Sequence, residues 1–158
     1  MKSIVIYDSL YGNTEKVAQS IGHALSELGE VSVLRVGQAN IDLLTGADLL
    51  VVGSPTQKFR PTLGMNTFLN SIPKNGLKGF RVAAFDTRLT KAEIDKMPPL
   101  PFFVQLFGYA AGRIAKQLVS KGSKLLIPPE GFLVQGMQGP LVEAELERAA
   151  TWAKKLFA

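Results

Sequence analysis

The sequence alternates short apolar runs with segments that carry a helical stripe, and this alternation restricts the possible folds more than any other feature. Short continuous apolar runs are typical of parallel strands that are buried on both faces. We predict strands near residues 3–7, 31–36, 48–53, 80–85 and 124–127, the last resuming at 132–135 beyond a pair of prolines. We predict helices near 14–28, 62–71, 104–120 and 140–157, with a short helical turn at 40–46.

Strands that alternate with helices imply a parallel sheet that is covered by helices on both faces. Right-handed crossovers leave few topologies for such a chain. We therefore expect one α/β domain over residues 1–158, with three layers and a doubly wound, five-stranded parallel sheet in the order 2-1-3-4-5.

The first predicted strand runs directly into a polar loop at which a helix begins. This loop consists of Ser9, Leu10, Tyr11, Gly12, Asn13 and Thr14. The free backbone N–H groups and the dipole of a helix N-terminus favour an anion, and Gly12 allows the backbone to approach it closely. The loop has no Lys or Arg, so hydrogen bonds and dipoles would hold a phosphate there. The spacing alone equally fits a well-capped helix with Asn13 or Thr14 as the cap.

Several other site types are excluded by the residues that are missing. The loop lacks the GK[ST] of a Walker motif, and no G-x-G-x-x-G follows the first strand. Asp8 has no acidic neighbour, and Gly53 stands where a phosphoreceiver domain needs an aspartate. The chain has no cysteine and one histidine, His23, so we expect no metal site and no catalytic residue.

The net charge of +5 and the pI of about 9.6 indicate an anionic partner or simple solubility. The basic run Arg113, Lys116, Lys121 and Lys124 has no acid between its members, and we interpret it as a solvated face. No nucleic-acid-binding module is recognisable. No apolar run approaches the roughly 20 residues of a membrane span, and the N-terminus lacks a signal cleavage site, so we expect a cytoplasmic protein.

The segment Val5 to Ala18, VIYDSLYGNTEKVA, resembles the phosphate-loop signature of the flavodoxin family. Its constrained positions are met by Val5, Ile6, Tyr7, Ser9, Gly12, Thr14 and Ala18. The similarity continues in VVGSPT at 51–56 and in the interrupted last strand, and only 57–66 and 88–107 match poorly. Flavodoxins are themselves an example of the rule that ligands bind beyond the carboxyl ends of strands one and three in this sheet order.

The resemblance implies one non-covalently bound FMN, whose phosphate lies in the loop at 9–14. The loops after strands three and four would clasp the isoalloxazine ring. These loops supply Ser54, Pro55, Thr56, Gln57, Lys58 and Phe59, and, from an expected turn at 86–89, Asp86, Thr87 and Arg88. Gln57 stands near the place of the usual stacking aromatic in the first loop, and Phe59 follows two residues on. The second loop lacks the usual tyrosine, and candidates for this second stacking residue are Phe102, Phe103, Phe107 and Tyr109. FMN is expected rather than FAD because no second glycine-rich turn offers a pyrophosphate site.

The segment at 97–107, MPPLPFFVQLF, has no counterpart in short flavodoxins. Its prolines predict that no regular helix begins before about residue 102. Its apolar side chains suit a lid over a cofactor or a partner surface. A loop folded back on the edge of the sheet is the alternative.

The resemblance favours an electron carrier that serves redox partner proteins, because FMN supplies the chemistry and no acid–base residue is required. The alternative is an FMN-dependent NAD(P)H:quinone oxidoreductase, since Ser54-Pro55-Thr56 is also similar to the flavodoxin-like quinone reductases. The sequence leaves the oligomeric state open.

Overall fold

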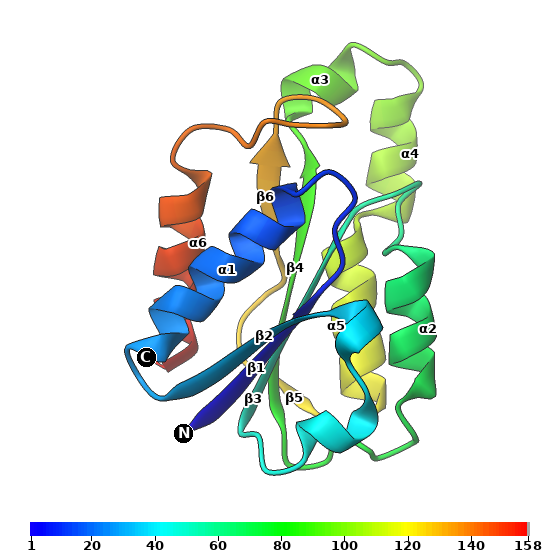
Figure 1. The fold of residues 1–158 in the computed structure, drawn as a ribbon. Coiled ribbons are helices and arrows are strands. Elements are labelled where there is room, and N and C mark those ends of the chain that lie inside the picture. The colour runs from blue at the N-terminus through cyan, green and yellow to red at the C-terminus, as the bar shows by residue number, and fades with distance from the viewer. Residues whose placement is uncertain (158) are drawn as a thin grey trace.

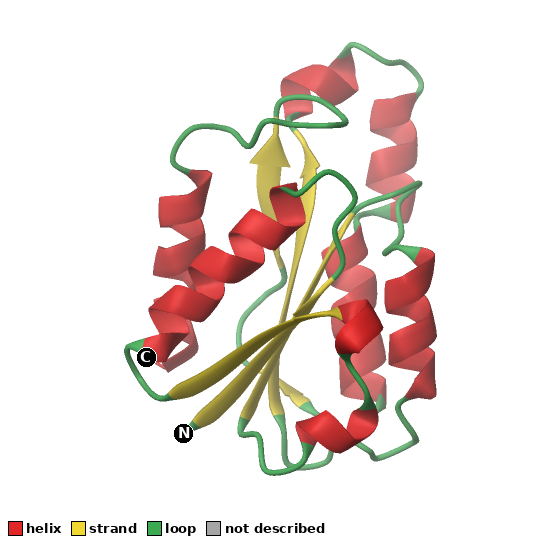
Figure 2. Ribbon diagram, in the orientation of Figure 1, coloured by secondary structure: helices red, strands yellow, loops and turns green. Residues whose placement is uncertain are grey.

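A twisted parallel sheet lies between two layers of helices in the computed structural model, which describes residues 1–157 (Figures 1 and 2). The strand order is β2-β1-β3-β4-β5, and β6 also pairs with β4. This order and the α/β class confirm the predicted fold. The strands are β1 (Lys2–Tyr7), β2 (Glu30–Arg35), β3 (Leu49–Pro55), β4 (Arg81–Leu89), β5 (Lys124–Leu125) and β6 (Glu130–Val134).

Two helices cover each face of the sheet, and two more lie beyond the carboxyl end of β4 (Figure 1). One face carries α1 (Asn13–Ser26) and α6 (Glu145–Lys154), and the other carries α2 (Leu63–Ser71) and α5 (Ala110–Ser120). The helices beyond β4 are α3 (Lys91–Asp95) and α4 (Leu100–Phe107). Short 3-10 turns are η1 (Val36–Gln38), η2 (Ile41–Leu44) and η3 (Lys155–Phe157).

The apolar strand runs fill both halves of the core because successive side chains point to opposite faces of a strand. In β1, Val5 and Tyr7 pack against α1 and α6, while Ile4 and Ile6 pack against α2 and α5. All four are buried. Burial on both faces explains why the strand runs are continuously apolar rather than alternating.

A cluster of aromatic rings fills the α1–α6 side and dictates a glycine at the end of β3. Phe85 meets Phe132 and Trp152 edge to face, with ring centroids 6.1 and 6.2 Å apart. A Cβ atom at Gly53 would lie 2.0 Å from the Phe85 ring. Gly53 is therefore explained by packing.

The prediction of a turn at 86–89 is wrong, because β4 continues to Leu89. Asp86 and Thr87 still pair with Ser54 and Pro55 of β3. On the other side, residues 85–89 pair with 130–134 of β6. The resumed half of the interrupted last strand thus holds this segment extended.

Two expected helix boundaries are also wrong. The last helix begins at Glu145 rather than near Pro140, because 140–142 return along β6: the Gln135 amide donates to the Pro140 carbonyl at 2.9 Å. The helix expected at 104–120 is divided at Gly108, whose φ is +75°. Its first part, α4, begins at Leu100 instead of near 102, because Pro101 stands in the first turn, where no N–H is needed.

Candidate functional site

The loop between β1 and α1 presents four backbone N–H groups that have no acceptor within residues 1–157. The Ser9 hydroxyl accepts from the Gly12 amide at 3.1 Å and more weakly from the Glu15 amide at 3.4 Å. Gly12 has a φ of +91°, and this left-handed residue turns the chain into the helix. The remaining amides belong to Leu10, Tyr11, Asn13 and Thr14. Unpaired amides at a helix N-terminus form an anion site.

The side chains of this loop divide into ligand candidates and supports. Thr14 is 1% exposed, and its hydroxyl lies 2.7 Å from that of Thr87, which extends from β4. The Asn13 side chain donates to the Gln138 carbonyl at 3.1 Å and so fastens the loop after β6. Tyr11 is half-exposed, as is Leu10. Ser9 and Thr14 are thus the buried hydroxyl side chains of this loop, and the Ser9 oxygen already accepts from two amides.

Arg35 clamps this loop from the end of β2, although no cation lies within the loop itself. Its guanidinium donates to the Ser9 carbonyl at 2.9 Å and to the Glu15 carboxylate at 3.0 Å. A second carboxylate, that of Asp8, lies 3.6 Å from the guanidinium. The hydrogen bond to Glu15 is the main reason that the pKa of Arg35 is raised, so the clamp stays charged. The sequence analysis did not identify Arg35. The feature that could have revealed it is the pairing of Arg35 with Tyr7, the residue that ends β1 just before the loop.

Asp8 and Ser54 fix the start of α2. The two Asp8 oxygens accept from the Ser9 amide and the Thr62 hydroxyl. The Ser54 hydroxyl accepts from the Thr62 amide at 3.0 Å. The ends of β1 and β3 are thereby tied together behind the loop at 9–14.

The loop after β3 is a tight hairpin that leans on α4. Gln57 and Arg60 exchange two backbone hydrogen bonds of 2.8 and 2.9 Å. Between them, Lys58 and Phe59 have φ angles of 47° and 70°, as a type I′ turn requires. The Phe59 ring lies 5.4 Å from that of Phe107 in α4. At the base of the hairpin, Pro55 ends β3 and the Thr56 hydroxyl accepts from the first amide of α5 at 3.0 Å.

Asp86 and Arg88 form an ion pair on the α5 face, and they lie in β4 rather than in the expected turn. Asp86 is fully buried and accepts from Arg88 at 2.7 and 2.8 Å and from the Ala111 amide at 2.9 Å. Burial raises the pKa of Asp86, while the bonds from Arg88 oppose that rise. The Arg88 guanidinium also lies 3.6 Å from the centroid of the Tyr109 ring. Because side chains alternate along β4, Thr87 points the other way and meets Thr14.

The structure thus brings together the predicted residues at 9–14 with Thr87 and places the hairpin at 57–60 at the end of β3. The aromatic candidates are all engaged elsewhere. Arg88 covers Tyr109, while Phe103 stacks on Phe107 at 6.1 Å and Phe102 meets Phe103 at 5.5 Å. The segment 97–107 is not a loop folded on the sheet edge, since it contains α4, which has no buried residue.

Other site types find no support in residues 1–157. No group of three or more His, Asp or Glu side chains there could hold a metal ion. None of the helices in that range combines the length and apolarity needed to cross a membrane. His23 is exposed in the last turn of α1, at the opposite end of that helix from the loop.

Comparison with known proteins gives one family and a consistent fold. The family model described as Flavodoxin matches residues 5–152. A flavodoxin from the domain Archaea is 24% identical, with a TM-score of 0.73 over 99% of this chain and 96% of that chain. Flavodoxin 1 from Bacillus cereus is 17% identical, with a TM-score of 0.77 over 99% and 97%. Rubredoxin oxygen:oxidoreductase from Desulfovibrio gigas is 20% identical, with a TM-score of 0.73 over 98% of this chain and 35% of that chain. No curated protein sequence matches the chain.

Proposed function

Because the chain belongs to the flavodoxin family, whose model matches residues 5–152, we propose that it binds one FMN non-covalently and carries electrons between redox partner proteins. The observation that supports this proposal most directly is the set of four unpaired amides at 10, 11, 13 and 14 beside the buried Thr14 hydroxyl. An anion with several acceptor oxygens satisfies all of these donors at once.

A terminal phosphate suits this loop. Its oxygens would accept from the four amides and from Thr14, and Arg35 would hold the loop in shape by its bond to the Ser9 carbonyl. The fit favours FMN over FAD, since a pyrophosphate needs a second glycine-rich turn. When bound, the flavin supplies the electron chemistry, while the protein binds and orients it.

The ring end of the flavin would lie toward the hairpin at 57–60 and the end of β3. Pro55 and Thr56 are half-buried there, and Gln57, Lys58 and Phe59 follow in the turn. The backbone amide of Thr56 donates to Thr87 at 3.0 Å, so this end is joined to the strand that faces the phosphate loop. Asp86 and Arg88 support the site through packing and are withdrawn from the set of residues proposed to contact the ring.

We favour a carrier because FMN supplies the redox chemistry without an acid–base residue of the protein, and the carboxylates beside the phosphate loop are already engaged. Asp8 is engaged with the Ser9 amide and Thr62, and Glu15 with Arg35 and Tyr7. An FMN-dependent NAD(P)H:quinone oxidoreductase is the alternative, and its support is the Ser54-Pro55-Thr56 motif.

The test has two steps. The absorbance spectrum of the purified protein, with and without added FMN, and the mass of the released cofactor decide whether FMN binds. The flavoprotein is then mixed anaerobically with NADPH or NADH. Slow bleaching with either nucleotide, and fast bleaching once a flavodoxin-type reductase is added, is the result expected of a carrier. Fast direct bleaching would establish the reductase instead.

A further inference from the structure

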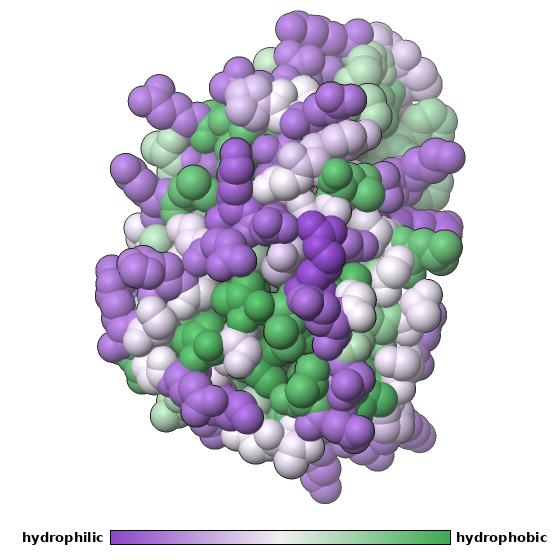
Figure 3. Space-filling view, in the orientation of Figure 1, coloured by the Kyte–Doolittle hydropathy of each residue, from purple (hydrophilic) through white to green (hydrophobic). Residues whose placement is uncertain are grey.

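Helix α4 exposes an apolar face that nothing in residues 1–157 covers. Phe102 and Leu106 are 61% and 63% exposed, and Phe103 and Phe107 are also open to solvent. The space-filling view shows apolar atoms gathered at the upper right, where Figure 1 places α4 (Figure 3). Contiguous exposed apolar groups of this kind mark an interaction surface.

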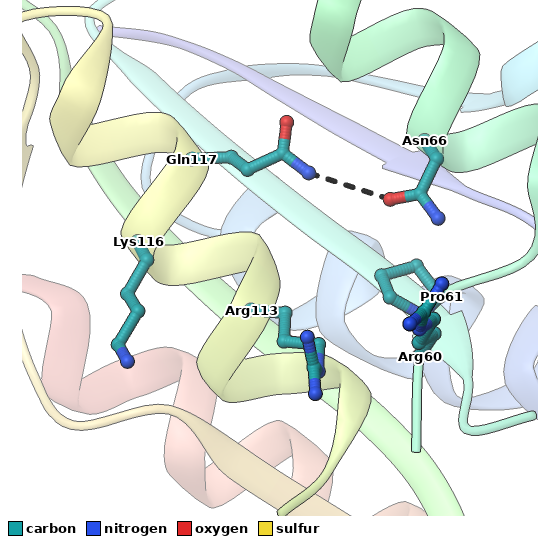
Figure 4. A pocket seen from close by; sticks show the side chains of 6 residues that line it. All are labelled: Arg60, Pro61, Asn66, Arg113, Lys116 and Gln117. Carbon is teal, nitrogen blue, oxygen red and sulfur yellow. Dashed lines mark hydrogen bonds between the residues drawn. The ribbon is translucent and has the colours of Figure 1, made fainter. Parts of the chain in front are cut away.

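A basic pocket lies next to this helix, between α2 and α5 (Figure 4). Its volume is about 320 Å³, and it is lined by Arg60, Pro61, Asn66, Arg113, Lys116 and Gln117. Gln117 donates to the Asn66 side chain at 3.3 Å and links the two helices. The three cations of the pocket are Arg60, Arg113 and Lys116. None of them forms an ion pair with a carboxylate of residues 1–157.

Arg113 joins the pocket to the apolar helix and has an unsatisfied donor. One of its terminal nitrogens donates to the Phe107 carbonyl at the end of α4 at 3.3 Å. Its Nε atom is buried and has no hydrogen-bond partner among the described residues. A buried unpaired donor on a cation is costly. Arg113 as a whole is partly exposed, so a carboxylate supplied from outside could pair with its charge.

We infer that the exposed side of α4 and the basic pocket together form one docking face for an acidic redox protein. This inference rests on the proposed electron-transfer function and names the class of partner. Carboxylates of the partner would enter the pocket, and an apolar patch would cover Phe102 and Leu106. Interfaces of this type combine charge complementarity, which steers encounter, with an apolar centre.

The position of the docking face relative to the flavin end supports this partner. Phe59 and Arg60 belong to the hairpin that follows β3, and Phe59 packs on Phe107 of α4. A protein seated on the face therefore lies beside the hairpin at which the flavin ring is proposed to end.

The same observations argue against two other occupants. A second copy related by a two-fold axis would bring Arg60, Arg113 and Lys116 toward the same unpaired cations, and like charges repel. An anionic membrane is flat, whereas these cations line an open hollow between two helices. Both occupants are outcomes that the experiment distinguishes.

The probe is a soluble b-type cytochrome of net negative charge, and basic cytochrome c is its control. Binding to the protein as purified is measured by calorimetry, and electron transfer from the reduced flavoprotein by stopped-flow absorbance. The double variant Arg113→Glu/Lys116→Glu, on α5 and outside the hairpin proposed to contact the flavin, is compared with Lys74→Glu/Lys78→Glu, which changes the net charge equally at exposed positions of the α2–β4 connection. Phe102→Gln/Leu106→Gln is compared with Val119→Gln, at an exposed position in α5.

We expect both docking-face variants to weaken binding of the acidic cytochrome and to slow electron transfer to it by about tenfold or more, and the matched controls by less than about twofold. Flavin content and transfer to a small neutral quinone stay unchanged. Equal losses in the two charge-reversal variants would overturn the inference, since only net charge would then matter. Concentration-dependent dimerisation abolished by Phe102→Gln/Leu106→Gln, or sedimentation with phosphatidylglycerol vesicles without cytochrome binding, would also overturn it. A protein that binds the cytochrome but takes up no FMN would instead contradict the proposed function.

Discussion

Thr14 has two roles that substitutions can separate, because its hydroxyl meets that of Thr87 inside the protein. The two Oγ1 atoms lie 2.7 Å apart, and the side chains are 1% and 5% exposed. Thr14→Val keeps the shape of the side chain but leaves the Thr87 hydroxyl buried without this partner. That loss costs about 1–3 kcal/mol in the unliganded protein. At about 2–4 °C per kcal/mol for a domain of this size, the melting temperature should fall by about 2–12 °C.

The second role of Thr14 is its proposed hydrogen bond to the FMN phosphate. A hydrogen bond to a charged group contributes about 1.5–3 kcal/mol. At about 1.4 kcal/mol per tenfold change, Thr14→Val should weaken FMN binding by roughly 10- to 150-fold. Binding is measured by the quenching of flavin fluorescence when the apoprotein is titrated into FMN.

Thr14→Val/Thr87→Val separates the two effects. With both hydroxyls removed, no buried partner is left unpaired, and urea unfolding should give a stability near that of the native apoprotein. FMN binding should remain as weak as in Thr14→Val. The control, Thr87→Val, should lose stability and keep most of the affinity for FMN. Native affinity in the double variant would refute the assignment of Thr14 to the phosphate.

Three further substitutions test the supports around the site. Arg88→Leu leaves the fully buried Asp86 carboxylate without its cation and should cost about 3–5 kcal/mol at pH 7. Burial raises the pKa of Asp86 in the folded protein. The loss of stability in Arg88→Leu therefore develops as the pH rises above the pKa of Asp86 in the unfolded chain, and urea unfolding should show a smaller loss at pH 5 than at pH 7. The pKa of Glu145 is lowered, because the hydrogen bonds from Arg148 and from a backbone amide outweigh the opposing effect of burial. The carboxylate therefore stabilises the fold at neutral pH, and this stabilisation is lost in acid. Glu145→Gln should therefore be less stable than the native protein at pH 7 and should lose less stability on acidification. Unfolding followed by circular dichroism measures both, and an equal loss of stability on acidification in the two proteins would contradict this reasoning. Gly12→Ala places a Cβ in open space at a φ of +91°, so the backbone alone should cost about 1–2 kcal/mol by urea unfolding and FMN affinity should fall.

The loop at 9–14, with its helix start and free amides, could be predicted from the sequence because it is a local structure. A strand, a glycine that turns the chain and a helix start follow within a few residues, and the free amides result from that order. Arg35 could not be found in the same way, since it reaches the loop from another strand. The contact depends on the pairing of β1 with β2, which places Tyr7 opposite Arg35, and the predicted sheet order alone does not give this residue-level pairing.

The end of β4 and the segment that follows it could not be predicted from local sequence, because distant segments determine them. Asp86 and Arg88 look like turn residues, but β6 pairs with them and holds them extended. Their opposite charges then satisfy each other inside the protein, which no local pattern indicates. The prolines before Phe102 do not delay the helix to that residue, because a helix tolerates proline in its first turn.

The two ends of the candidate site are built from different contacts, and affinity and partner choice should therefore be separable. The phosphate end depends on Thr14, Thr87 and Arg35, all tied to the central strands. The partner end depends on α4 and the hairpin, which meet through Phe59 and Phe107 at the surface. A substitution at the phosphate end changes flavin binding without altering the docking face. A substitution on the exposed side of α4 changes the rate with a partner protein while the flavin stays bound, so one chain can keep its cofactor while its partner changes.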